Sequence, residues 1–248
     1  MLRKLTHLKI RQNAFYSIRP EPWQMDTLTD IGSRKIFNED HDILRESVRK
    51  FYSAVDPARK IKWEEQGFVD REFWLEVGEQ GFIGVEQPIE KGGWGGDFYS
   101  NCIQLEEQIY SGTPGLFNLQ SDLVMPYVAH YGTDEQVERY MTGMRDGKII
   151  GCLAMTEPSG GSDLQSIKTT AVKDGDDWIL NGSKVFISSG HNADLALVVA
   201  VTDKTVEYVL IVFLVVLIYY SICLENERMV FPCLWSIQVC PALNVENC

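Results

Sequence analysis

The sequence Met-Thr-Glu-Pro-Ser-Gly-Gly-Ser-Asp, residues 155–163, carries more information about this chain than any other segment. An apolar run over residues 149–155 predicts a strand that leads into this segment. The segment then holds two hydroxyls, Thr156 and Ser162, and the adjacent Gly160-Gly161 pair. Because glycine lets the backbone approach a ligand and take positive φ, successive N–H groups here can converge on a phosphate. The sequence therefore predicts a pyrophosphate-binding loop, although an ordinary turn uses the same residue types.

A second segment, residues 178–188, reads Trp-Ile-Leu-Asn-Gly-Ser-Lys-Val-Phe-Ile-Ser. The Asn181-Gly182 dipeptide is typical of a two-residue hairpin turn, and side chains alternate beyond it. We therefore expect a hairpin with its turn at this dipeptide. The hairpin would bring an aromatic side chain, Phe186, and a hydroxyl, Ser188, to one place.

Composition sets limits on the class of protein. The chain has 248 residues, of which 45% are hydrophobic, which is enough for a core in one large or two modest domains. A formal net charge of -12 argues against a nucleic-acid partner bound by a basic face. The six cysteines form no Cys-x-x-Cys pair and the four histidines are scattered, so we expect neither a metal site nor a disulfide framework.

The first twenty residues carry basic residues and no acid, interleaved with apolar positions. The basic residues are Arg3, Lys4, Lys9, Arg11 and Arg19. This pattern predicts a mitochondrial transit peptide within a leader over residues 1–30, with a frayed basic tail as the alternative.

Helical periodicity dominates the chain up to residue 146. We expect a helix capped by Asn38 and helices over Arg71–Gln80, Tyr99–Tyr110, Gln120–Tyr131 and, capped by Thr133, up to Met144. Pro126 must distort or interrupt its helix because proline has no N–H. The adjacent acids Glu106 and Glu107 point about 100° apart on a helix, which favours a solvated face over a shared acid–base site.

Strand patterns follow from residue 149, at 149–155, 169–173, 178–180, 183–187 and 195–202. A run of helices followed by a run of strands predicts an α+β fold, with a helical part at 31–146 followed by a part made of strands. The glycine-rich segment 91–97 lacks the Walker pattern and is expected to be a flexible loop.

The order of these parts resembles the acyl-CoA dehydrogenase family, and within it the branch that acts on long-chain substrates. Besides the two segments above, residues 39–42 leading into 48–51, residues 81–84 and residues 180–184 carry the resemblance. It covers roughly residues 36–204. The fold implied is an N-terminal helical domain, a middle β domain and a C-terminal four-helix bundle, with FAD held between the last two and across a subunit interface. The resemblance implies that the β domain, at 147–204, is antiparallel and incomplete and that the bundle is absent, because the resemblance stops near Lys204.

The resemblance implies a flavin site on both segments. Its cofactor-binding residues would be Leu153, Met155, Thr156, Gly161, Ser162, Phe186, Ile187 and Ser188. Thr156 would hydrogen-bond the flavin ring, Phe186 would pack against it and Ser188 would donate near its redox nitrogen. Ser162 would also approach the CoA part of the substrate. Residues 159–162 read Ser-Gly-Gly-Ser where the family commonly has Gly-Ala-Gly-Ser, and Ser189 stands where Asn is common.

The activity implied is FAD-dependent α,β-dehydrogenation of long-chain fatty acyl-CoA in the mitochondrial matrix, with electron-transfer flavoprotein as a partner. In such enzymes a Glu removes the α proton while the β hydrogen leaves as hydride to the flavin. The family supplies that Glu from its C-terminal half. We therefore name no catalytic residue, and whether this chain is active alone stays open.

Residues 205–248 are expected to be a hydrophobic tail outside the family. Tyr208–Tyr220 is thirteen successive apolar or aromatic residues. Three alternatives stay open: a tail unrelated to the fold, a buried strand or helix on the sheet edge, and a transmembrane helix over Tyr208–Leu224. Two functional alternatives accompany them: a non-catalytic chain that pairs with full-length subunits in a homo-oligomer or mixed oligomer, and a membrane-attached protein.

Overall fold

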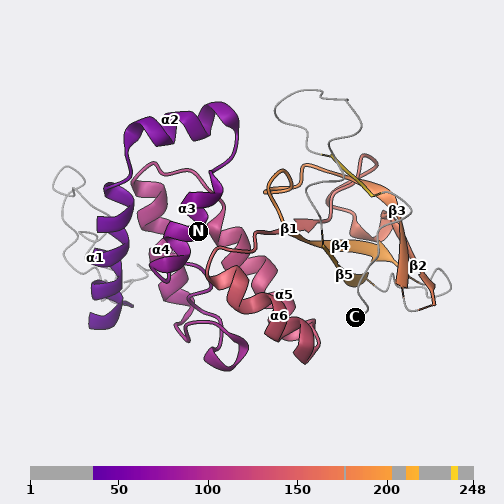
Figure 1. Ribbon diagram of the computed structural model, residues 1–248, viewed down its shortest axis with the longest axis horizontal. Helices are drawn as coiled ribbons and strands as arrows, with labels where there is room; N and C mark the ends of the chain where they lie inside the picture. The colour runs from indigo at the N-terminus through magenta and orange to yellow at the C-terminus, as the bar shows by residue number, and fades with distance from the viewer. Residues whose placement is uncertain (1–35, 176, 203–210, 218–235, 240–248) are drawn as a thin grey trace, which may run out of the picture. The chain divides into compact units, whose positions relative to one another are not determined.

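The computed structural model describes residues 36–175, 177–202, 211–217 and 236–239 (Figure 1). Two compact units divide the chain, residues 1–43 and Leu44–Cys248. In the first unit Asn38 Oδ1 accepts a hydrogen bond from His41 N at 2.9 Å, and His41 Nδ1 accepts one from Asn38 N at 3.1 Å. This reciprocal cap starts helix α1 (Glu39–Ser53) where the sequence predicts it. The expected transit peptide lies outside the described residues.

The second unit contains the remaining helices, and most of them begin and end close to the predicted residues. They are α2 (Pro57–Gln66), α3 (Arg71–Glu79), α4 (Phe98–Tyr110), α5 (Met125–Tyr131) and α6 (Asp134–Arg145). Thr133 and Gln136 form the predicted capping box of α6. Sequence analysis missed α2, although Asp56 caps it and Pro57 occupies its first turn, which is a recognisable start signal.

Pro126 distorts its helix as expected. The segment η4 (Leu119–Val124) is a π-helix, and Met125 N donates to Gln120 O, five residues back. Pro126 follows in the first turn of α5, where its missing N–H is tolerated. The predicted helix over 120–131 is therefore a π-helical segment followed by the α-helix α5.

The strands form one mixed sheet. They are β1 (Gly151–Ala154), β2 (Thr170–Asp174), β3 (Asp177–Val185), β4 (Leu195–Val201), β5 (Ile211–Leu217) and β6 (Ser236–Val239). Their order is β1-β4-β2-β3-β6, with β5 paired to β4. The α+β fold class is confirmed. The expectation of an antiparallel sheet is wrong in one respect, because β4 runs parallel to β1 and to β2.

The predicted hairpin at Asn181-Gly182 is wrong, since both residues lie inside the nine-residue strand β3. A Cβ on Gly182 would overlap Thr169, whose Cα would lie 2.7 Å away and whose Cβ would lie 2.6 Å away. Close approach of a neighbouring chain segment therefore explains the glycine, not a turn. Gly175, at φ 62°, follows β2 where it pairs with β3, and Asp174-Gly175 is the turn signal that sequence analysis overlooked.

Strand β5 lies within the expected tail, in register with β4 from Leu195↔Leu217 to Val201↔Ile211. Within Tyr208–Leu224 only residues 211–217 are described, and they form this strand. In the described part of the chain, no helix is both long and apolar enough to cross a membrane.

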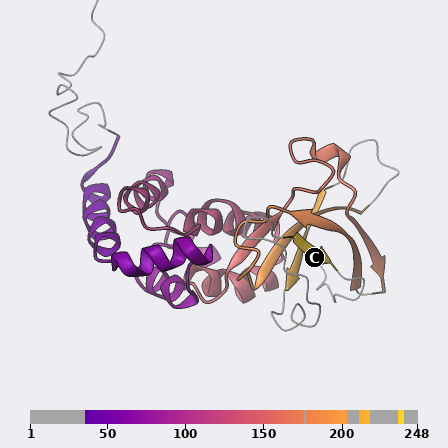
Figure 2. The same ribbon diagram turned by 90° about the horizontal axis from the view of Figure 1, so that it is seen from above.

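The core of the second unit has two parts, one on each face of β4. Leu195 and Leu197 pack into a cluster with the helices, which includes Phe73, Trp74 and Met144. Ala196, Val198 and Ala200 pack instead with residues of β1, β2 and β3. Strand side chains alternate between faces, so this strand, buried along all but its last residue, joins the helices to the sheet (Figures 1 and 2). The helices after residue 43 and the sheet belong to one compact unit. The domain division at residue 146 therefore stays a prediction.

The expectation of a solvated face at Glu106 and Glu107 is wrong for Glu107, which is buried. Its carboxylate accepts hydrogen bonds from Arg45 Nη1 at 2.8 Å and Arg49 Nε at 2.8 Å, and Glu106 shares the Arg45 Nη1 donor at 2.9 Å. Burial opposes ionisation, but the two arginines outweigh it and lower the pKa of Glu107. The pair is part of a structural ion network within the helices.

The glycine-rich segment 91–97 is a loop, as expected, and its backbone is extensively hydrogen-bonded. After the short 3-10 helix η3 (Ile89–Lys91), Gly93 N donates to Pro88 O and Gly95 N donates to Gln87 O, at 2.9 and 2.8 Å. A Cβ on Gly93 would overlap the backbone of Gln87. Glycine here permits close backbone packing, which the expectation of a flexible loop did not include.

Candidate functional site

The two segments singled out from the sequence lie side by side in the structure. Val185 N, at the end of β3, donates a hydrogen bond to Thr156 O at 2.9 Å. Lys184 Nζ donates to Met155 O at 2.9 Å and to Glu157 Oε1 at 2.9 Å. Three consecutive residues of the 155–163 loop are thus bonded to two consecutive residues of β3. This contact places Thr156 next to the segment that contains Phe186.

Glu157 is the buried acid of this loop, with 5% of its surface exposed. Its Oε1 accepts from Thr169 N at 2.9 Å and its Oε2 accepts from Lys168 N at 2.7 Å, just before β2. Burial alone would raise the pKa of Glu157, but hydrogen bonds from Thr169, Lys184 and Lys168 outweigh it and hold the pKa at about 2. The carboxylate is therefore ionised and connects the loop to β2 and β3.

Lys184 has no exposed surface. It shares the inward face of β3 with buried Leu180, two strand periods away. Burial lowers its pKa, against the opposing effect of Glu157. Sequence analysis missed this pair, yet the signal was present: a lysine in the inward register of a strand needs a buried acceptor.

Phe186 and Ser189 both have left-handed backbone conformations, at φ 59° and φ 60°. This region is uncommon for residues other than glycine and is an outlier for a bulky side chain such as Phe186. Phe186 is 62% exposed, while the neighbouring Ile187 is buried and Ser188 is exposed. The unusual backbone turns the aromatic ring of Phe186 to the surface at the end of β3.

The predicted phosphate nest at Gly160-Gly161 is wrong in its backbone geometry. Neither glycine lies in the left-handed region. Gly160 N donates to Glu157 O at 3.1 Å and Gly160 O accepts from Glu157 N at 3.0 Å, so this amide closes a turn within the loop. Gly161 instead lies against Thr156, because a Cβ on it would be 3.3 Å from Thr156 Cγ2.

The other predicted residues occupy different surroundings. Leu153, on β1, is half-buried and packs against the core cluster shared with the helices. Met155 and Thr156 are half-buried, and Ser162 is exposed just before the 3-10 helix η5 (Leu164–Ser166). The structure thus brings Thr156, Gly161 and Val185 together, while Ser162 and Ser188 are both exposed.

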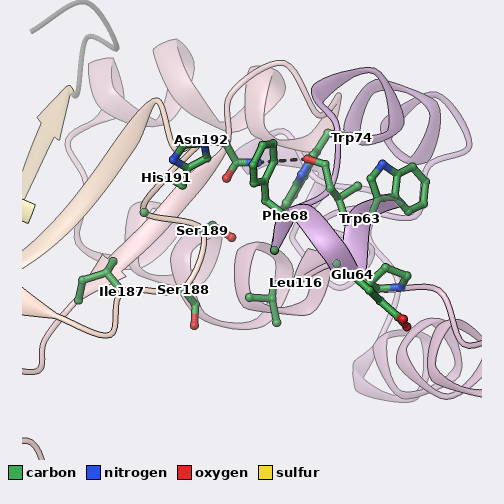
Figure 3. A pocket seen from close by; sticks show the side chains of 15 residues that line it. Trp63, Glu64, Phe68, Trp74, Leu116, Ile187, Ser188, Ser189, His191 and Asn192 are labelled. Atoms are coloured by element: carbon green, nitrogen blue, oxygen red, sulfur yellow. Dashed lines mark hydrogen bonds between the residues drawn. The ribbon is translucent and has the colours of Figure 1, made fainter. Parts of the chain in front are cut away.

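A pocket of about 310 Å³ lies beside the segment that follows Phe186 (Figure 3). Ile187 and Ser188 line it, whereas the other six predicted residues are not among its lining residues. Its opposite wall comes from α2, α3 and the connection before η4, including Trp63, Trp74 and Leu116.

The pocket is mainly apolar and aromatic. Trp63 and Trp74 are almost fully buried. His191 packs on Phe68 with ring centroids 4.5 Å apart, and burial lowers the pKa of His191. A neutral imidazole against an aromatic ring leaves a wall suited to apolar or planar groups.

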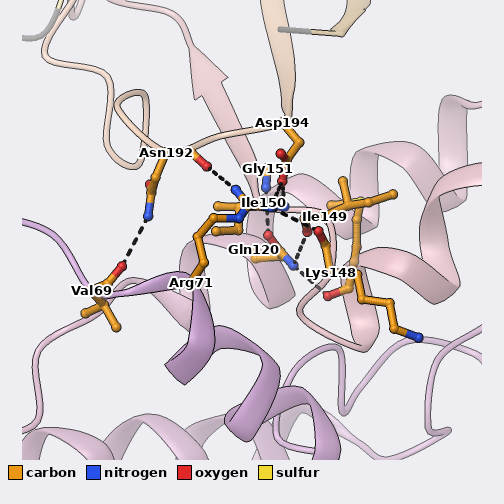
Figure 4. A network of polar contacts seen from close by, with 10 residues as sticks. Val69, Arg71, Gln120, Lys148, Ile149, Ile150, Gly151, Asn192 and Asp194 are labelled. Carbon is orange, nitrogen blue, oxygen red and sulfur yellow. Dashed lines mark hydrogen bonds and ion pairs between the residues drawn. The ribbon is translucent and has the colours of Figure 1, made fainter. Parts of the chain in front are cut away.

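A polar network beside the pocket joins α3 to the strands (Figure 4). Arg71 donates to Asn192 O at 2.9 Å, to Lys148 O at 3.1 Å and to Asp194 Oδ2 at 2.7 Å. Gln120 contacts the start of β1 from the other side, accepting from Gly151 N at 2.7 Å. The bonds from Arg71 hold residues 192–194 against α3, and the Gln120 bond holds the start of β1.

Comparison with known proteins gives two family matches. The model of the acyl-CoA dehydrogenase N-terminal domain matches residues 38–148, and that of the acyl-CoA dehydrogenase middle domain matches residues 152–217. The second match extends past Lys204 and includes β5.

Relatives and solved structures agree with these matches. The chain is 53% identical over 178 residues to the mitochondrial long-chain specific acyl-CoA dehydrogenase of Sus scrofa, covering 71% of this chain and 41% of the relative. It is similar to the crystal structure of an acyl-CoA dehydrogenase from Geobacillus kaustophilus, with 32% identity and a TM-score of 0.75 over 86% of this chain and 59% of that one. A glutaryl-CoA dehydrogenase from Mycobacterium smegmatis in complex with FADH2 is 31% identical, with a TM-score of 0.63 over 68% of this chain and 44% of that one. The chain spans about two fifths of the length of the curated relatives it matches.

Proposed function

This chain belongs to the acyl-CoA dehydrogenase family, and from that premise we propose that residues 153–188 bind FAD for the α,β-dehydrogenation of long-chain fatty acyl-CoA. The observation that supports this most is the bond from Val185 N to Thr156 O. It brings a half-buried hydroxyl and an exposed aromatic ring to neighbouring positions, which is what a planar, polar-edged ring requires.

The residues present fit the flavin ring of FAD better than they fit its diphosphate. Phe186 offers an exposed aromatic face, and the Thr156 side chain lies against Gly161, where a Cβ would crowd it. Gly160 uses its amide within the loop, so phosphate binding would draw on Ser162 and on backbone groups other than that amide. The proposed site residues are therefore the eight named from the sequence, with Thr156, Phe186 and Ser188 on the ring.

Bound FAD would supply the hydride acceptor for the β hydrogen of the thioester. The chain's own residues would bind and orient: Phe186 would cover the ring, Thr156 would hydrogen-bond its edge and Ser188 would donate beside its redox nitrogen. Ser162 would also contact the CoA part of the substrate. We assign a proton-abstracting base to none of the described residues.

The partners and location follow from the same proposal. Fatty acyl-CoA is the substrate, electron-transfer flavoprotein is the electron acceptor, and the mitochondrial matrix is the compartment. The relative from Sus scrofa, a long-chain specific mitochondrial enzyme by its name, supports the acyl-chain length and the location.

Flavin uptake tests the proposal directly. Purified protein is mixed with FAD, passed through a desalting column and scanned for the visible flavin band. We expect retained flavin, together with quenched flavin fluorescence from packing against an aromatic ring. A protein that emerges free of flavin after native and refolding incubations would contradict FAD binding.

A second candidate function is pairing with a full-length subunit in a mixed oligomer. Several large apolar side chains of the second unit are exposed, among them Phe98, Ile109, Tyr110 and Tyr131. Exposed apolar area of this kind is common at subunit contacts. Co-expression with a full-length long-chain enzyme, followed by size separation, tests it, and the absence of any mixed species would exclude it.

A further inference from the structure

We propose that the buried ion pair between Lys184 and Glu157 is a positioning device that sets Thr156 and Phe186 for the flavin. This role rests on the proposed function. Neither residue is expected to touch the cofactor, so both act through the residues that they hold.

The geometry shows how one side chain controls the loop. Lys184 Nζ donates to Met155 O and to Glu157 Oε1, both at 2.9 Å. These acceptors belong to the residues on either side of Thr156. The next residue along β3, Val185, bonds Thr156 O itself at 2.9 Å. Thr156 is thereby held by bonds to its own carbonyl and to the residues before and after it.

The same two strand residues directly precede Phe186. Its φ of 59° is unfavourable for a bulky side chain and persists only where the surroundings determine the backbone on both sides. Lys184 and Val185 provide that restraint on one side. The position of the loop and the direction of the aromatic ring are therefore coupled through one pair of strand residues.

Stability alone does not explain a charged pair at this place. Removing two charges from water is costly, and well-packed apolar side chains of similar volume often stabilise a protein as well or better. An apolar pair could fill this space but could neither donate to Met155 O nor accept from Lys168 N and Thr169 N. The directional bonds of the ammonium group are what a positioning role requires.

The chain offers a matched control in a second buried ion pair. Arg45 and Glu107 are 3% and 4% exposed, against 0% and 5% for Lys184 and Glu157. Arg45 Nη1 lies 2.8 Å from Glu107 Oε1. This pair connects α1 to α4, whereas Lys184 and Glu157 connect β3 to the 155–163 loop. A comparable loss of stability is expected from breaking either pair, whereas only one of them holds the loop.

The experiment compares Lys184→Met, Glu157→Gln and Arg45→Met in the full chain. We expect Lys184→Met to raise the Kd for FAD roughly tenfold, as loss of a supporting partner commonly does, and to change the shape of the bound flavin's visible spectrum. Arg45→Met should leave both unchanged. Amide hydrogen exchange, measured without FAD, should accelerate over residues 155–162 and 185–188 in Lys184→Met but not in Arg45→Met.

Each outcome decides the matter. Wild-type-like FAD affinity in Lys184→Met, with the wild type binding normally, would overturn the inference while leaving the proposed function intact. If Lys184→Met fails to fold, Glu157→Gln carries the same comparison, because it keeps one acceptor oxygen and removes the charge. If the wild type takes up no FAD, the proposed function fails, and the exchange rates still decide: equal rates over residues 155–162 in the Lys184 and Arg45 variants would overturn the positioning role.

Discussion

Arg71 donates a hydrogen bond to Asp194 at 2.7 Å, and the same oxygen, Asp194 Oδ2, accepts another from Ile150 N at 2.8 Å. One carboxylate thus binds a guanidinium from α3 and the backbone just before β1. Asp194 itself directly precedes β4. This contact connects the helices to two strands of the sheet.

Arg71→Met should lower the free energy of unfolding by about 1–3 kcal/mol, because bonds to a carboxylate and to the carbonyls of Asn192 and Lys148 are lost. Urea unfolding measures this. Lys62→Met is the control, since among the described residues Lys62 makes one side-chain bond, to Asp70, against three for Arg71, and should cost less than about 1 kcal/mol. Equal losses in the two variants would contradict the role given to Arg71.

Glu157 should make stability depend on acid pH. Burial raises the pKa of Glu157, but hydrogen bonds outweigh it and hold the folded-state value at about 2, below the ordinary 4.5. A depressed folded pKa contributes stability that is complete above 4.5 and is lost as pH falls through about 2. The stability difference between wild type and Glu157→Gln should therefore shrink over that range, as unfolding at several pH values would measure. A difference that stays constant with pH would count against an ionised Glu157.

Gly182→Ala should destabilise the chain by about 1–3 kcal/mol, because the added methyl group meets Thr169 within the sheet. Thermal unfolding of the variant measures this. Gly160→Ala is a suitable control: its Cβ would lie 3.7 Å from Ser166 Oγ, an ordinary contact, and its φ is not left-handed. Similar unfolding temperatures for the two variants would show that the packing of Thr169 against residue 182 does not require a glycine there.

Asp122 should make stability depend on pH in the direction opposite to Glu157. Asp122 is an exposed residue, yet desolvation of its carboxyl, and then the negative charge of Glu86, raise its pKa to about 6. A raised folded pKa means that stability is fully present below the ordinary 3.8 and is lost as pH rises through about 6. Asp122→Asn should therefore stabilise the chain above pH 6 and not below pH 3.8. Unfolding curves on both sides of this range test it, and a gain that is the same at every pH would exclude a perturbed Asp122.

Helix boundaries could be read from the sequence because their signals are local. Asn38, and Thr133 with Gln136, cap helices through bonds to residues only three positions away. The Asn181-Gly182 dipeptide predicted a turn but lies inside β3, because a residue outside the local pattern determines the need for glycine. Gly182 is a glycine because Thr169 packs against it, which no local pattern reveals.

The site was predictable in its parts but not in its connections. Spacing and resemblance identified the Thr156 loop and Phe186, and the structure places them side by side. The Lys184–Glu157 pair was not found, because its partners are 27 positions apart. Buried Glu107 was missed for the same reason, since its arginines lie 58 and 62 positions away.

The most direct test of the account is the Kd for FAD of Phe186→Ala beside that of Phe98→Ala. Both are phenylalanines at the surface, 62% and 65% exposed, and only Phe186 adjoins the Thr156 loop. We predict that Phe186→Ala weakens FAD binding about tenfold through lost aromatic packing, while Phe98→Ala binds like the wild type. Equal FAD affinity in wild type and both variants would contradict a flavin site on residues 153–188.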